Sequence, residues 1–363
     1  PLVFFLIACL IPVALLGQAV SARPQAPTAS RILALATNVQ DDQATIGTVN
    51  VLSGTITAFG PGQANCCTNS VLDAALDAAG GRYFALLTRT AELSQRLLTF
   101  STQTGAVTSS TPLTTSLSVN YLAYDTVSAQ LLALVFTTDP FTLQMARINP
   151  ATAAITLLNN PIPDCCSPIA FDAAYDDVHR KLYAVIQPYV GEPQPRLITF
   201  SGADGSVLAD VAITTTLELD HLAYDASTAT LWAVAYDAAT DAERLASVDT
   251  ATGIVTPLGA GVANCCNRMV TDVAIDPAAQ VLIAPMVDAS AGGFPVPAFF
   301  RFSLATGEVL GSAPIDPAYY LFYIAYDPMP VAPPTPTATA TGQPTATPAA
   351  SLYMPAIQAP TSP

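Results

Sequence analysis

The sequence predicts an all-β fold, a six-bladed β-propeller, from three observations. A motif that ends in aspartate recurs at Asp77, Asp125, Asp176, Asp225, Asp276 and Asp327. The spacings between these aspartates are 48, 51, 49, 51 and 51 residues. The runs around each aspartate are apolar and rich in strand-forming residues, and polar turn sequences separate them. A period of about fifty residues built from short strands is typical of propeller blades.

The composition agrees with one large closed domain and excludes some partners. The chain has 363 residues, 27 of them acidic and 12 basic, for a formal net charge of -15, and Lys181 is the only lysine. Nucleic acids and anionic membrane surfaces need a basic footprint, so we expect neither as a partner.

Residues 1–22 have the pattern of an export signal. An apolar run over residues 2–17 is followed by small residues at 20–22, where a signal peptidase could cut. We therefore expect a secreted or surface-attached protein. The residues before Cys9 also resemble a lipoprotein box, so lipidation there is an alternative, whereas the proline-broken run is short for a retained membrane span. Residues 23–30 form a Pro/Ala/Ser linker to the propeller, which is predicted over residues 31–328.

The two ends of the propeller are predicted to share one blade. Residues 31–36 match only the second half of the motif, and residues 321–327 match only its first half. We expect the C-terminal strand to be the inner strand of a blade whose outer three strands come from residues 32–59. Such closure leaves no open sheet edge.

Outer hairpins are predicted from a repeated turn sequence. A short polar side chain opens each turn, at Asn50, Ser101, Asn149, Ser201, Asp249 and Ser303. Glycine stands at the fifth position of every turn except one, which has Ala153. The polar side chain can accept bonds from the next backbone amides, and glycine accepts a positive φ. These hairpins resemble those of bacterial YVTN-type and quinoprotein-like propeller repeats, which implies the architecture and no particular activity.

The composition changes after the propeller. Residues 329–350 are rich in Pro, Thr and Ala, which predicts an extended, disordered stalk whose threonines could carry glycans. Residues 351–363 form a short apolar tag that either docks or is sorted, or is an inert end.

Cysteines occur as adjacent pairs in alternate blades. Apart from Cys9, the cysteines are Cys66, Cys67, Cys165, Cys166, Cys265 and Cys266, with the pairs 99 and 100 residues apart. The propeller is therefore predicted to consist of three two-blade repeats. Each pair ends six residues before an inner-strand aspartate, which places it on a loop that runs toward the channel.

Three states of these cysteines are compatible with the sequence. In an exported protein they can form vicinal disulfides or bridges between neighbouring loops, or as reduced thiols they can hold a soft metal. The bridges either stiffen the rim loops or offer a flat surface to a ring-shaped ligand. Methanol-dehydrogenase-type quinoproteins are known for using a vicinal disulfide against their cofactor, but this chain lacks the tryptophan motifs of that family. It has only Trp232, which argues against a quinone.

A second constellation lies four residues before each repeat aspartate, and its members are Asp73, Tyr121, Asp172, His221, Asp272 and Tyr323. We interpret these six as candidate ligand-binding residues at the channel mouth. Three carboxylates that converge there would favour a bound cation such as Ca²⁺, so Asp73, Asp172 and Asp272 are a candidate metal site. In the alternative interpretation each carboxylate accepts bonds from backbone amides of its own rim loop. The repeat aspartates themselves are predicted to form turns.

Two functions remain from different classes. The first is a recognition module that binds a small polar ligand, a glycan or a surface protein at the channel mouth. The second is a metal-assisted hydrolase resembling the six-bladed gluconolactonases, which hold their metal with a glutamate, Asn and Asp. None of Glu92, Glu192, Glu218, Glu243 and Glu308 falls at the six positions, so enzymatic activity is the weaker prediction. His221 beside the carboxylates could act as a base.

Overall fold

The computed structural model describes residues 31–40, 43–63, 71–89, 94–115, 117–138, 141–158, 160–163, 172–186, 194–263, 271–288 and 296–328. All seven cysteines lie outside these ranges, as do the predicted signal, linker, stalk and tag. The described residues form strands and turns, and none of them belongs to a helix long and apolar enough to cross a membrane.

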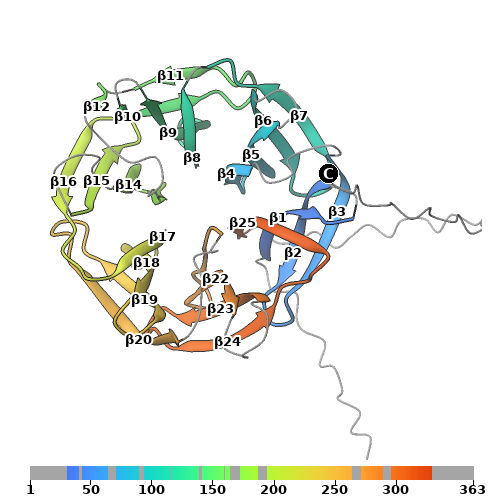
Figure 1. The fold of residues 1–363 in the computed structure, drawn as a ribbon. Helices are drawn as coiled ribbons and strands as arrows, with labels where there is room; N and C mark the ends of the chain where they lie inside the picture. The colour runs from blue at the N-terminus through green and yellow to red at the C-terminus, as the bar shows by residue number, and fades with distance from the viewer. Residues whose placement is uncertain are drawn as a thin grey trace, which may run out of the picture. The chain divides into compact units, whose positions relative to one another are not determined.

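Six antiparallel sheets form the blades of a ring, which confirms the predicted propeller (Figure 1). We number the blades along the chain. Blade 1 contains β25 (Tyr319–Asp327), β1 (Arg31–Asn38), β2 (Gln43–Asn50) and β3 (Thr55–Gln63). Blade 2 contains β4 (Val71–Asp77), β5 (Arg82–Arg89), β6 (Ser94–Ser101) and β7 (Val107–Pro112). Blade 3 contains β8 (Ser118–Asp125), β9 (Gln130–Thr138), β10 (Phe141–Ile148), β11 (Ile155–Leu157) and β12 (Ile162–Pro163).

The other three blades have four strands each. Blade 4 contains β13 (Asp172–Asp176), β14 (Lys181–Ile186), β15 (Arg196–Ser201) and β16 (Val207–Ala212). Blade 5 contains β17 (Glu218–Asp225), β18 (Thr230–Asp237), β19 (Ala242–Val248) and β20 (Val255–Ala263). Blade 6 contains β21 (Ala274–Asp276), β22 (Val281–Asp288), β23 (Val296–Ser303) and β24 (Val309–Pro314). In each blade the first strand named lies nearest the axis of the ring.

The ring closes through the first and last strands of the propeller, as predicted. β25 pairs antiparallel with β1, with Leu33 opposite Ala325. At the end of this ladder Arg31 Nε lies 2.8 Å from Asp327 Oδ2, and both side chains are largely buried. Segments 296 residues apart are therefore joined by a ladder and an ion pair.

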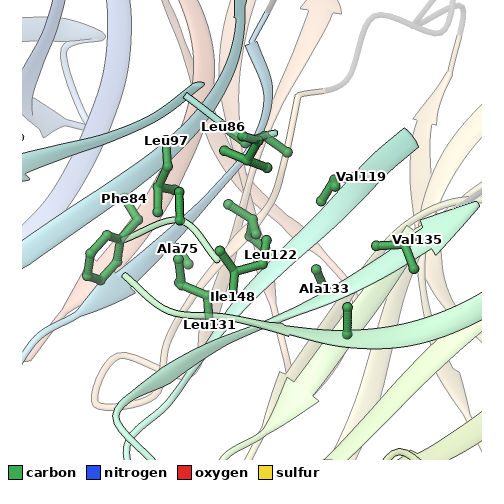
Figure 2. Close-up of a cluster of buried hydrophobic side chains, with 13 residues drawn as sticks. Ala75, Phe84, Leu86, Leu97, Val119, Leu122, Leu131, Ala133, Val135 and Ile148 are labelled. Atoms are coloured by element: carbon green, nitrogen blue, oxygen red, sulfur yellow. The ribbon is translucent and has the colours of Figure 1, made fainter. Parts of the chain in front are cut away.

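The core consists of six apolar clusters, one between each pair of neighbouring blades. Figure 2 shows the cluster between blades 2 and 3, where Phe84 and Leu97 meet Val119 and Leu131. Each blade is covered on both faces, so a middle strand is apolar along its length and does not alternate. In β9 every side chain from Leu131 to Phe136 is buried.

The outer hairpins confirm the predicted turn chemistry. Asp249 Oδ1 accepts hydrogen bonds from the amides of Ala251 and Thr252, both at 2.9 Å. The fifth residue of each turn has a positive φ, and in the turn without glycine Ala153 adopts a φ of 55°. Gly105 has a second role, because a Cβ there would lie 1.7 Å from the Phe59 carbonyl oxygen of blade 1. These turns therefore set how closely the outer strands of neighbouring blades approach.

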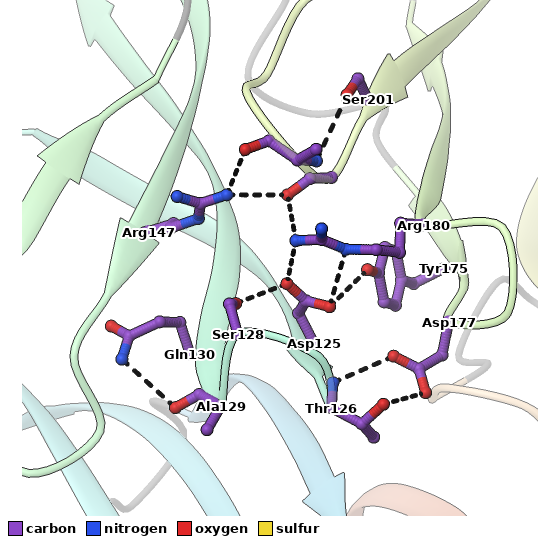
Figure 3. A network of polar contacts seen from close by, with 12 residues as sticks. Asp125, Thr126, Ser128, Ala129, Gln130, Arg147, Tyr175, Asp177, Arg180 and Ser201 are labelled. Atoms are coloured by element: carbon purple, nitrogen blue, oxygen red, sulfur yellow. Dashed lines mark hydrogen bonds and ion pairs between the residues drawn. The ribbon is translucent and has the colours of Figure 1, made fainter.

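Five of the six repeat aspartates accept bonds within their own turns, as predicted, whereas Asp327 binds Arg31. Asp176 Oδ1 accepts bonds from the amides of Val178 and His179, both at 3.1 Å. Asp125 of blade 3 also pairs with Arg180 of blade 4, with Nη2 and Oδ2 2.6 Å apart, and accepts a bond from the Tyr175 hydroxyl (Figure 3). This network fixes blade 4 against blade 3.

Candidate functional site

The six residues of the predicted channel-mouth constellation lie at or beside the innermost strands. Asp272 stands two residues before β21, and the other five lie on inner strands. In four blades a β-bulge directly precedes the residue of interest, at Leu72, Asn120, Asp220 and Phe322. A bulge bends its strand and changes the direction of the next side chain.

Two of the three carboxylates connect blades within the two-blade repeats. Asp73 of blade 2 accepts bonds from its neighbour Ala74, at 2.6 Å, and from the amide of Leu122 in blade 3, at 2.8 Å. Asp172 of blade 4 repeats this arrangement with the amides of Ala173 and of Leu222 in blade 5. These carboxylates bind backbone amides, but the second amide belongs to the next blade and not to their own rim loop. The bonds give a structural reason for an aspartate in alternate blades.

Asp272 differs from its two counterparts. Its Oδ1 accepts a bond from the amide of Val273 at 2.8 Å. Within the described ranges, no donor from blade 1 binds its other oxygen in the way that Leu122 and Leu222 bind Asp73 and Asp172. Among the described residues, the second oxygen of Asp272 therefore has no hydrogen-bond donor.

The three carboxylates lie close enough to act on one another. Burial raises the pKa of Asp73 well above its ordinary value, and the charge of Asp272 adds to this, although the two amide bonds oppose it. Burial and the charge of Asp172 raise the pKa of Asp272 to about 7. Tyr121 and Tyr323 also have raised pKa values, first from burial and then from the charges of all three carboxylates. The structure thus brings the predicted residues together around the axis.

His221 pairs with one of these carboxylates. Its Nδ1 lies 3.3 Å from Asp172 Oδ2. Burial lowers the pKa of His221, but the bond to Asp172 and the charges of Asp172 and Asp272 outweigh burial and raise that pKa to about 9. The imidazole is therefore protonated at neutral pH and compensates the charge of Asp172.

A cavity of about 560 Å³ lies along the inner strands of blades 1, 3, 4, 5 and 6. Its aromatic walls come from Tyr121, Tyr175, Tyr224 and Tyr326, and alanines and branched aliphatic residues line much of the rest. Two carboxylates line it, Asp272 and Asp225. Asp225 is engaged by the hydroxyls of Ser227 and Thr228 in its own turn. Asp272 is therefore the carboxylate of this lining that can receive a ligand.

The candidate metal site at Asp73, Asp172 and Asp272 stays a prediction. In the ranges given above, no three His, Cys, Asp or Glu side chains are grouped so that they could hold a metal ion. The cysteine pairs lie outside the described residues, so their disulfides and their metal or ligand binding stay predictions.

Sequence reasoning missed a buried carboxyl group beside this site. Glu243 on β19 is fully buried, and no described residue donates a hydrogen bond to either of its side-chain oxygens. Burial and the neighbouring carboxylate of Asp220 raise its pKa to about 8. The repeat contains a signal of this site, because the residues 199 and 100 positions earlier are the buried Ala44 and Leu143. An acid at a position that is otherwise apolar in the threefold repeat marks an exception to simple packing.

Comparisons with known proteins bear on the fold alone. No protein-family description matches the chain, and no curated protein matches it. A chain in the crystal structure of a nidogen/laminin complex is 14% identical, with a TM-score of 0.54 over 82% of this chain and 98% of that one. A candidate 6-phosphogluconolactonase from Bacteroides uniformis is 13% identical, with a TM-score of 0.50 over 80% of this chain and 85% of that one.

At these identities the likeness extends to architecture and not to activity. The resemblance to YVTN-type and quinoprotein-like repeats stays a prediction. The fold of the described chain is that of a six-bladed β-propeller.

Proposed function

We propose that the propeller is a recognition module that binds a small ligand next to Asp272, in the cavity along the inner strands, which we call the axial cavity. The observation that carries the proposal is the coincidence of a cavity of about 560 Å³ with a carboxylate oxygen that no described donor occupies. Small-molecule sites are commonly cavities of about 300–1,000 Å³ with apolar walls and few convergent polar groups. A small ligand fits this description better than a glycan chain or a protein surface.

The rigidity of the ring supports a preformed site. Each interface between blades holds an apolar cluster, and the Asp73 and Asp172 bonds hold two pairs of inner strands together. A site on packed strands loses little entropy when a ligand binds, which favours affinity.

The alternative of a metal-assisted hydrolase has less support. The hydrolase alternative is supported by the likeness of the fold to that of a candidate lactonase. However, the described residues offer no group that could hold a metal ion. With a pKa of about 9, His221 is protonated at neutral pH and cannot take up a proton as a general base.

We also propose that the protein is exported and displayed on an extended stalk. The apolar run and small residues before position 23 and the Pro/Thr/Ala composition of residues 329–350 support this. Export would expose the three cysteine pairs to oxidising conditions, and we propose disulfides within each pair. Peptide mapping without reductant tests this, because cross-links between peptides of different blades would exclude it.

The binding proposal is tested by two matched substitutions, Asp272→Asn and Asp73→Asn, in the full chain. Ligand-observed NMR with a panel of small aromatic and aliphatic fragments measures binding, and thermal unfolding measures stability. We expect fragments to bind the wild type, and Asp272→Asn to weaken polar fragments with little loss of stability. Asp73→Asn keeps one acceptor oxygen and replaces the other by an NH2 group, so one of its two backbone amides loses its acceptor; it should lower stability and leave binding unchanged. If no fragment binds, or if both variants bind as the wild type does, the proposal is wrong.

A further inference from the structure

The charged side chains that line the axial cavity are acidic. Its described lining contains two aspartates and no lysine, arginine or histidine. The whole chain has the same bias, with 27 acidic against 12 basic residues. A cavity with walls of low polarity and one sign of charge attracts counter-ions of the opposite sign.

Four described cations near the inner strands are already paired. Arg31 binds Asp327, Arg82 binds Asp77 and Arg180 binds Asp125, with N–O distances of 2.8, 2.6 and 2.6 Å. His221 pairs with Asp172 at 3.3 Å. Asp272 is thus left without a cationic partner in direct contact among the described residues. An ionised carboxylate in a poorly hydrated place is unfavourable unless a cation or several donors approach it.

The tyrosines of the lining also favour a positively charged ligand. Four tyrosine side chains line the cavity, and the face of an aromatic ring attracts organic cations. Alanine and aliphatic side chains between them suit the apolar body of such a ligand. Metal ions gain little from these walls, because Ca²⁺ prefers six to eight oxygen ligands.

We propose that the ligand of the axial cavity is a small organic cation, whose ammonium group contacts the Asp272 oxygen to which no described residue donates and whose apolar body lies against the tyrosines. This inference rests on the proposed function, that the cavity binds a small molecule. A charge-assisted bond of this kind contributes roughly 1.5–3 kcal/mol, which corresponds to at least about tenfold in affinity.

Three probes of nearly equal shape test the charge preference. Benzylammonium, benzyl alcohol and benzoate share one ring and differ in the charge of the substituent. Ligand-observed NMR titrations at about pH 8 on the full chain compare their affinities for the wild type and for Asp272→Asn, because Asp272, with a pKa of about 7, is mostly ionised there. We expect benzylammonium to bind about tenfold more tightly than benzyl alcohol, and benzoate more weakly than both. In Asp272→Asn the advantage of benzylammonium should disappear, while the affinity for benzyl alcohol should stay the same.

The outcomes separate this inference from the proposed function. If benzyl alcohol and benzylammonium bind the wild type equally, the cavity is a binding site but its ligand is not selected for positive charge. If benzoate binds best, the charge preference is the reverse of the one proposed. If Ca²⁺ binds at Asp272 and displaces benzylammonium, a metal site replaces the organic-cation site. If none of the three probes binds, the inference fails together with the binding function. The comparison within the wild type does not depend on the folding of the variant.

Discussion

Glu243 illustrates how one side chain can affect the stability of a whole blade. It occupies a position at which the threefold repeat otherwise has Ala44 and Leu143, and its side chain is fully buried. With the carboxylate of Asp220 beside it, the protonated form of Glu243 is favoured at neutral pH. A buried acid of this kind lets the folded protein hold a proton that the unfolded chain releases.

Stability should therefore fall as the pH rises through the range that Glu243 controls. The folded pKa of about 8 exceeds the ordinary value of 4.5, so the folded state binds more protons between these two values. Glu243 alone should lower the free energy of unfolding by roughly 2–4 kcal/mol from pH 5 to pH 8, and Glu243→Gln should make the slope shallower by that amount, while the raised pKa values of Asp272 and His221 keep the rest of it. Urea unfolding at several pH values measures the effect. Glu308→Gln, at an exposed position, is the control, and equal slopes for Glu243→Gln and the wild type would refute the assignment.

At the scale of the elements, the outer hairpins place neighbouring blades at a fixed spacing. A glycine at the end of such a turn adopts the positive φ without steric cost, and at Gly105 it also leaves room for the preceding blade. The turn that ends in Ala153 has the same φ sign, which shows that the backbone path is set by the repeat and not by glycine alone.

Gly105→Ala and Ala153→Gly should accordingly have unequal effects. Gly105 has a φ of 67°, and a new Cβ would meet the Phe59 carbonyl oxygen at 1.7 Å, so we expect a loss of at least about 2 kcal/mol. For Ala153→Gly, relief of the strained φ offsets the greater flexibility of glycine, and we expect a change below about 1 kcal/mol. Chemical denaturation of the two variants provides the measurement. A similar, small effect at both positions would show that the blades move apart easily.

The predictability of these features from the sequence depends on how local they are. The hairpin at Asp249, the turn at Asp176 and the shared blade of β1 and β25 follow from chemistry repeated along the chain. The bond from the Leu122 amide to Asp73 was not predictable, because it depends on the bulge that re-aims Asp73 and on the rotation between two blades. For the same reason the sequence suggested three equivalent carboxylates, whereas the contacts make Asp272 different.

The whole ring depends on the strand that closes it. β25 contributes Tyr323 and Ala325 to the cluster between blades 1 and 2, and Ile324 to the cluster between blades 6 and 1. Its loss would remove the ladder to β1 and the ion pair between Arg31 and Asp327. Both neighbours of blade 1 would then lose apolar contacts, so the damage would spread beyond one blade.

Deletion of residues 321–327 should therefore unfold the propeller, or lower its melting temperature by well over about 10 °C. Truncation after residue 331 leaves every described strand in place, and we expect no change in melting. Calorimetry on both shortened chains and the full chain distinguishes these results. A propeller that melts normally without residues 321–327 would show that closure by β25 is dispensable.

The pairing of Arg31 with Asp327 places the beginning and the end of the ring next to each other. A circularly permuted gene could therefore join residue 328 to residue 31 through a short linker and start the chain elsewhere, for example between β16 and β17. Every ladder within the blades would survive, because none of them crosses that new opening. The order in which the blades are synthesised is thus separable from the order in which they stand around the axis.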